Sequence, residues 1–273
     1  MNPLHQDLVK TLIELYTLQS QLGNIAASSL QVPDNAVFNR DAALAAGYTE
    51  EAVRFIAYMP YLSSEEDGFE IFPNTFVERY VEEPDEDVYA YQALRELDTD
   101  PFEGVYIPPS YIKLTKHNVY GSIFLYDTDT GLVRDWRPFD DDIDKHNQNF
   151  KVLPAKTPAE TFGPWIDSYR KLKILKYTDI LTCWEPDEPI TFLDPVDASK
   201  REKRRLAELK IRDFYLGNGW NVDAKEQDGF NLERFVEQRD AYREKVLYPL
   251  FEDEGNPETE AGEHEQEEVT REL

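Results

Sequence analysis

The chain has 273 residues, 41 % of them hydrophobic and 13 % aromatic, so it is long enough for one large folded domain or two small ones. It carries 55 acidic side chains against 29 basic ones, and this net charge of −26 argues against nucleic acid or an anionic membrane as its partner. The single cysteine, Cys183, excludes a disulfide framework, and no apolar run is as long as a membrane span. Because the first ten residues do not resemble a signal peptide, we expect a reducing compartment, the cytoplasm or the nucleus.

The beginning of the chain predicts helices. Residues 6–27 place their apolar side chains on one broad helical face. A short helix is expected over 39–46, ended by Gly47, and Thr49 is a good N-cap for the next helix. We therefore expect a helical N-terminal segment over residues 1–60.

Residues 63–103 are strongly acidic. They contain fourteen acidic side chains and two arginines, which gives a net charge of −12. Two short apolar stretches, 69–72 and 76–81, interrupt the acidic residues and predict strands near the edge of a sheet. Residues 82–87 read EEPDED, and a second acidic run, DDDID, covers 140–144. We expect both runs to be solvated loops.

The strongest strand signal is the stretch 119–136, VYGSIFLYDTDTGLVRDW. Its two halves alternate in the period of two that is typical of strands, and the DTDTG sequence between them is turn chemistry. Gly131 suits a positive φ, and Gly121 inside the first strand indicates a bulge or a close approach of another backbone. We expect this hairpin at the centre of a sheet of about five or six strands.

Two further helical regions follow. Thr157, with Pro at the first helical position and Glu160 three residues on, forms a capping-box signature, and Pro164 predicts a break near Gly163. Residues 199–216 predict a helix that ends at a Gly-Asn-Gly stop.

The last elements are a helix over 231–247 and an acidic stretch over 252–273, which holds ten acidic side chains and one arginine. In total the pattern predicts an α+β fold, a central, mostly antiparallel sheet with helices packed on it. The core is expected over 61–177, a C-terminal helical extension packed on that core over 178–251, and a disordered acidic tail over 252–273.

Two acidic stretches resemble metal sites, but a simpler structure is favoured for each. Asp127, Asp129 and Gly131 begin like a calcium loop, but the glycine falls on the third ligand position, so the turn is favoured. A solvated loop is likewise favoured over a cation site for Asp140, Asp141, Asp142 and Asp144. No metal-ligand spacing connects the four histidines, which are His5, His117, His146 and His264.

No nucleophile with its base is visible either, and Cys183 beside Trp184 is most simply a buried thiol. We therefore expect no enzyme, no catalytic residue and no cofactor. The alternative is a carboxylate-dependent hydrolase of the glycosidase kind, but 55 acidic side chains give no way to select a pair.

A basic protein partner suits the acidic surface made by residues 63–103 with the loop 140–144. Aromatic side chains among the acids, Tyr89 and Tyr91 included, are candidate anchors, and the alternative that they face the core stays open. The predicted partner-binding residues are Phe69, Phe72, Tyr80, Glu82, Glu83, Asp85, Glu86, Asp87, Asp140, Asp141 and Asp142.

The stretch YIKLTKHNVYGSIFLYDTDTGLV resembles the SUKH superfamily, which includes yeast cell-wall assembly regulators and bacterial toxin-immunity proteins. Its resemblance lies in the apolar strand 112–114, in Gly121 and Asp127 on the next strand, and in Trp136 on the return. The helix TPAETFGPWIDSYRKL is similar to the closing segment of that family, and the sequence IRDFYLGNGWNVDAKEQDGF is similar to extensions of uncharacterised fungal proteins. The resemblance implies an α+β fold without catalytic residues, and a protein-binding role in cell-wall signalling or toxin neutralisation.

Overall fold

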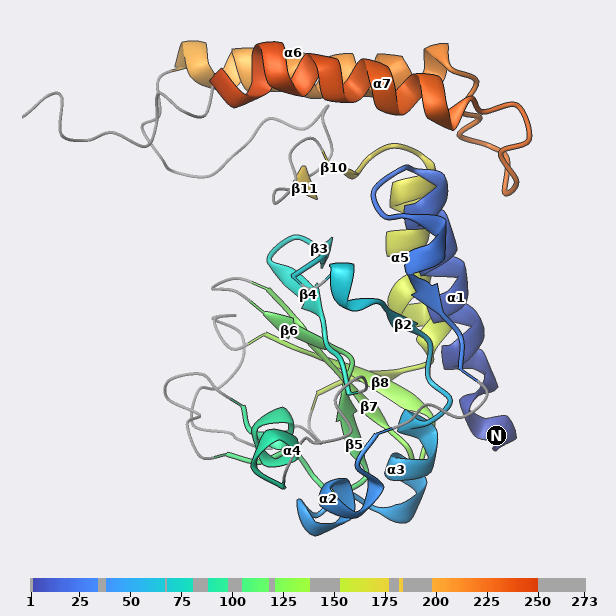
Figure 1. Cartoon of the computed structure of the whole chain (residues 1–273), viewed down its shortest axis with the longest axis vertical. Helices are drawn as coiled ribbons and strands as arrows, with labels where there is room; N and C mark the ends of the chain where they lie inside the picture. Colours follow the sequence, from blue (N-terminus) through green and yellow to red (C-terminus); the bar gives the residue numbers. More distant parts are fainter. Residues whose placement is uncertain are drawn as a thin grey trace, which may run out of the picture. The chain divides into compact units, whose positions relative to one another are not determined.

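The computed structural model of the chain (Figure 1) divides into two units. Unit one comprises Met1–Lys176 with Ile180–Trp184, and unit two comprises Tyr177–Asp179 with Glu185–Leu273. Unit one therefore contains the expected helical segment together with nearly all of the expected core. The structure describes residues 2–33, 38–66, 68–80, 88–97, 105–117, 121–137, 153–176, 182–183 and 198–249.

Unit one is built on antiparallel strands. The larger sheet has the order β5-β7-β8-β9, with the bounds Tyr111–Lys113, Ile123–Asp127, Leu132–Trp136 and Ala155–Lys156. The smaller sheet has the order β3-β4-β6, with the bounds Glu70–Phe72, Thr75–Val77 and Thr115–His117. Figure 1 shows these strands at the centre of the unit, so the prediction of an α+β fold is confirmed.

Strands β5 and β6 are two parts of one run that changes partner at Leu114. The Leu114 amide still donates to the carbonyl of Phe124 on β7, at 2.8 Å. The Thr115 hydroxyl then takes the place of a backbone group, because it donates to the Ser122 carbonyl and accepts from the Phe124 amide, both at 2.9 Å. The two sheets are thus joined by hydrogen bonds across this run.

The predicted hairpin is present as β7 and β8, with Ile123 opposite Trp136 and Asp127 opposite Leu132. The strand begins at Ile123 rather than at Val119, because Gly121 and Ser122 are not part of it; residues 118–120 lie outside the described residues. Gly131 has φ +71° at the end of the turn, as its place in the sequence predicts.

Helices and two short strand pairs complete unit one. Helix α1 and helix α5 lie side by side (Figure 1). The helices α1 to α5 span Gln6–Gln21, Arg40–Ala45, Glu50–Ile56, Val88–Arg95 and Pro158–Arg170. The strand pairs are β1 with β2 and β10 with β11, at Leu30–Gln31, Tyr61–Leu62, Leu175–Lys176 and Thr182–Cys183. The 3-10 turns η1, η2 and η3 cover Pro3–His5, Ala27–Ser29 and Ser64–Glu66.

Three local predictions need correction. Helix α5 begins with the expected Thr157–Glu160 capping box but continues through Pro164. The proline removes the donor to the Glu160 carbonyl, and because Glu160 and Pro164 are both exposed, water can replace that donor. Helix α1 ends at Gln21 rather than at residue 27. Helix α4 was not predicted, because the expected strands and the expected acidic loop 82–87 end before Val88, where the helix begins.

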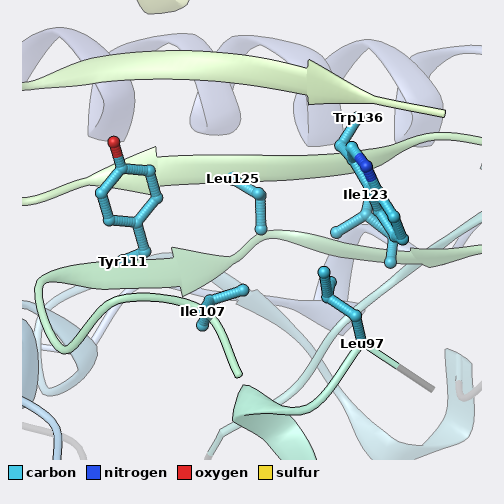
Figure 2. Close-up of a cluster of buried hydrophobic side chains, with 6 residues drawn as sticks. All are labelled: Leu97, Ile107, Tyr111, Ile123, Leu125 and Trp136. Atoms are coloured by element: carbon cyan, nitrogen blue, oxygen red, sulfur yellow. The ribbon is translucent and has the colours of Figure 1, made fainter. Parts of the chain in front are cut away.

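The core occupies both faces of β7. Figure 2 shows Ile123 and Leu125 meeting Leu97 and Ile107, in one cluster with Trp136. On the opposite face, Phe124 and Tyr126 pack against aromatic rings of α5 and α3, those of Phe162 and Phe55, with ring centres 5.0 and 5.1 Å apart. Every residue of β7 is buried for this reason.

Unit two is a helical hairpin. Helix α6 (Ala198–Gly217) is followed by α7 (Leu232–Tyr242) and by the π-helical turn η5 (Arg243–Leu247). The rings of Tyr215 and Phe235 stack at 3.9 Å between α6 and α7, and both side chains are fully buried.

The connection between α6 and α7 is closed by backbone contacts at its base. The amide of Asn231 donates to the Asn218 carbonyl at 2.8 Å. Gly219 has φ +94°, and a Cβ there would collide with the carbonyl of Gly229. These contacts explain why the predicted Gly-Asn-Gly stop ends α6 at Gly217.

Candidate partner-binding surface

Three of the aromatic residues predicted as anchors, those among the predicted partner-binding residues, lie in the core. Phe69, Phe72 and Tyr80 are 5 %, 2 % and 1 % exposed. The Phe72 ring packs 4.6 Å from that of Trp165, and the Tyr80 hydroxyl accepts the Lys113 amide at 2.9 Å. The structure thus corrects their assignment to an exposed interface, because Phe72 packs against helix α5 and Tyr80 is hydrogen-bonded to strand β5.

The acidic members of the predicted site lie outside the described residues. They are Glu82, Glu83, Asp85, Glu86, Asp87, Asp140, Asp141 and Asp142. Their part in binding stays a prediction.

One aromatic residue of the acidic region does face solvent. Tyr89 on α4 is 75 % exposed. Tyr106, which lies in the chain between α4 and β5, is 50 % exposed. Tyr91, two residues further along α4, is fully buried and fixes the opposite side of the helix. Because Glu96 and Tyr106 form an antiparallel bridge, Tyr106 belongs to the same part of unit one as the end of α4. Tyr106 was not singled out from the sequence, where a lone tyrosine between strand signals has no distinguishing pattern.

Cations hold the C-terminal end of α4. The Arg95 guanidinium donates to the carbonyls of Ala46 and Ile107, so it ties α4 to α2 and to the chain before β5. The Lys113 ammonium, which is almost completely buried, donates to the carbonyl of Glu96 at 3.0 Å and more weakly to that of Ala93 at 3.4 Å. Lys113 thus satisfies the Glu96 carbonyl just beyond the helix, and the positive charges of Arg95 and Lys113 interact favourably with the negative end of the helix dipole. The exposed Tyr89 therefore stands on a helix with a fixed position.

A second polar arrangement connects His5 with two distant residues. Its Nδ1 lies 2.7 Å from the Tyr126 hydroxyl, and its Nε2 lies 2.9 Å from Oε1 of Glu51. Hydrogen bonds from Asn2 above all, and then from His5, together with the charge of Arg54, hold the pKa of Glu51 below its usual range.

The Glu51 carboxylate only accepts, so Nε2 of His5 donates to it; where the imidazole is neutral, Nδ1 accepts from the Tyr126 hydroxyl. The order of carboxylate, imidazole and hydroxyl resembles a catalytic triad, but His5 is 2 % exposed and Tyr126 is fully buried. Burial also raises the pKa of the Tyr126 phenol, which opposes its use as a nucleophile. We interpret the arrangement as a structural connection between η1, α3 and β7.

Replacing Tyr126 with Phe is expected to lower the free energy of unfolding by about 1–3 kcal/mol, because Nδ1 of His5 loses its donor in a buried site. Urea unfolding followed by circular dichroism measures the change. The matched control is Tyr106→Phe, on a half-exposed ring, which should stay within about 0.5 kcal/mol of the parent. Equal stability of Tyr126→Phe and the parent would contradict this role.

Two buried carboxylates on the strands, those of Glu70 and Asp127, accept hydrogen bonds from residues of the adjacent turns. Oε1 of Glu70 accepts from the Asn74 amide at 2.6 Å in the β3–β4 turn. The Asp127 carboxylate accepts from Asp129 and Thr130 inside the hairpin turn, and from Ser110 at 3.2 Å. This agrees with the choice of a turn over a calcium loop at Asp127.

Among the residues that the structure describes, no group of three or more His, Cys, Asp or Glu side chains could hold a metal ion. Within the same ranges, no helix is long and apolar enough to cross a membrane. Comparisons of the chain with models of protein families, with curated proteins and with solved structures gave no match.

Proposed function

We propose that this chain is a non-enzymatic interaction module that binds a basic partner protein through the surface around α4. The observation that supports the proposal most is the exposure of Tyr89, at 75 %, on a helix fixed at its end by Arg95 and Lys113. A rigid, exposed aromatic side chain is a typical anchor of a protein interface, because it loses little conformational entropy on burial.

The charge around this anchor in the sequence favours a basic partner. Helix α4 follows the acidic run 82–87 directly, and Asp98 comes immediately after Leu97. The whole region 63–103 carries a net charge of −12. Charge of one sign around an apolar anchor increases the rate of association with an oppositely charged partner and selects against wrong ones.

The resemblance to the SUKH superfamily adds a finer proposal. It favours a partner in cell-wall assembly or signalling, or a toxin that the chain neutralises. The single cysteine favours binding in a reducing compartment, the cytoplasm or nucleus. We propose no hydrolase, because no described carboxylate pair favours one over the turn roles of Glu70 and Asp127.

The double variant Tyr89→Ala with Tyr106→Ala is expected to bind the partner at least about 10-fold more weakly, as the loss of central aromatic anchors does. The partner is first captured from cell extract at several salt concentrations and identified by mass spectrometry, and its affinity is then measured with purified proteins. Tyr248→Ala is the matched control, because this tyrosine is also exposed, at 36 %, but belongs to unit two.

A second arm of the same experiment tests the charge. Changing Glu82, Glu83, Asp85, Glu86 and Asp87 to Ser should slow association and weaken its salt dependence, whereas a chain that stops after Phe251 should bind like the parent. Capture of no partner at any salt concentration would contradict the proposal. An equal loss in the Tyr248 control, or a loss only in the shortened chain, would place the binding surface elsewhere.

A further inference from the structure

The first half of α6 is the basic part of an otherwise acidic chain. Residues 199–212 contain seven Lys or Arg against two Glu, a net charge of +5. A basic helix surface in a protein of net charge −26 attracts any polyanion, including acidic parts of its own chain.

Packing against α7 leaves part of this helix uncovered. The buried stripe of α6 consists of Ala207, Ile211 and Tyr215, which recur every four residues and are at most 1 % exposed. Arg205 and Lys210 are exposed, and Leu206 between them in the sequence is 54 % exposed. The uncovered side therefore combines positive charge with an apolar side chain.

The hairpin brings the end of α7 back to this basic half. Phe214 of α6 meets Tyr242 of α7, with ring centres 5.6 Å apart, and η5 also contacts α6. The helical chain continues for seven residues from Tyr242 to residue 249, about 10 Å at 1.5 Å per residue. In an antiparallel pair this distance leads to roughly the level of residue 207, near the middle of the basic half.

We propose that the acidic segment 252–273 binds the basic half of α6 in the same chain. The segment carries ten acidic side chains against one arginine, a net charge of −9, and both parts belong to unit two. Its 22 residues reach up to about 70 Å when extended, whereas residues 199–212 span about 20 Å of helix. Attachment at the adjacent end of α7 gives a high effective concentration, so that weak ion pairs suffice.

This contact has a functional consequence. It keeps the basic half of α6 from binding nucleic acid or other polyanions. The contact is independent of the proposed function, because it uses different residues and a different partner.

Carbodiimide cross-linking of the full chain, followed by mass spectrometry, tests the contact directly. The expected cross-links join Lys200, Lys203 or Lys210 to carboxylates of 252–273, in a yield that does not change with protein concentration. At about 1 M salt, where the Debye length falls to about 3 Å, the yield should drop several-fold. Cross-links only to Lys171, Lys173 or Lys176 would overturn the proposal, as would a yield that rises with concentration or an absence of cross-links.

Retention on a heparin column gives a second readout. The chain that stops after Phe251 should elute at higher salt than the full chain, because its basic helix is uncovered. The matched control adds Lys200→Gln, Lys203→Gln and Lys210→Gln to the shortened chain, and it should elute like the full chain; circular dichroism verifies that both are folded. Equal elution of the full and shortened chains would overturn the proposal.

Discussion

Raising the pH above about 10 is expected to unfold unit one cooperatively, because four of its buried tyrosines resist ionisation. Burial raises the pKa of Tyr16, Tyr48, Tyr61 and Tyr80, since the phenolate would lose its hydration in the core. Their mutual proximity adds to this effect, because an ionised Tyr48 or Tyr16 would repel an ionised Tyr61.

Because these pKa values are raised by folding, unit one loses stability as the pH rises. A phenol whose pKa is raised in the folded state contributes its full stability below the unfolded pKa of about 10, and that stability is lost as the pH rises toward the folded pKa. Each such tyrosine costs about 1 kcal/mol at about pH 11, or roughly 4–6 kcal/mol for the four together. This is comparable with the whole stability of a typical domain, about 5–15 kcal/mol.

Circular dichroism and the ultraviolet absorbance of tyrosinate, recorded at the same pH values, measure the effect. Unfolding and the ionisation of the buried phenols should occur in one step. Tyr16→Phe should lower the dependence of the unfolding free energy on pH by about one proton. Complete ionisation near pH 10 with retained circular dichroism would contradict the buried positions.

Replacing Gly121 with Ala is expected to destabilise unit one by about 2–3 kcal/mol, because the added Cβ meets backbone rather than a flexible side chain. The Cβ would fall on the carbonyl group of Asn74 and lie 3.0 Å from Cβ of His117. Next to this contact, the Ser122 amide donates to the Thr75 hydroxyl at 2.9 Å, so any shift would also disturb the junction of β4 with β7.

Urea unfolding measures the Gly121→Ala effect, and Gly163→Ala is its matched control. A Cβ at Gly163 meets nothing within 4 Å, and Ala is the better helix former, so this variant should be unchanged or more stable by up to about 1 kcal/mol. Similar stabilities of the two variants would show that the β3–β4 turn does not press against Gly121.

Local sequence signals were sufficient for much of the fold. The hairpin of β7 and β8 was predicted from alternation and turn residues, and the capping box of α5 from Thr157 and Glu160. The close approach at Gly121 was also predicted, although only the structure identifies Asn74 as the neighbour. Such features are predictable because residues a few positions apart determine them.

The missed features depend on residues far apart in the sequence. Helix α4 is short and lies among acidic residues, and its end is held by Arg95 and Lys113 through contacts that no local pattern contains. The connection of His5 joins residues that are 46 and 121 positions away.

The sequence by itself determined the fold class, most helix ends and the distribution of charge along the chain. Only the tertiary structure decided which aromatic side chains of the acidic region are exposed and which are core. Phe72 and Tyr80 are buried because they contact α5 and β5, whereas Tyr89 is exposed because Tyr91 holds the opposite side of the same helix. Aromatic residues have the same apolar surface in either place, so their burial depends on the packing of distant elements, which composition and periodicity do not contain.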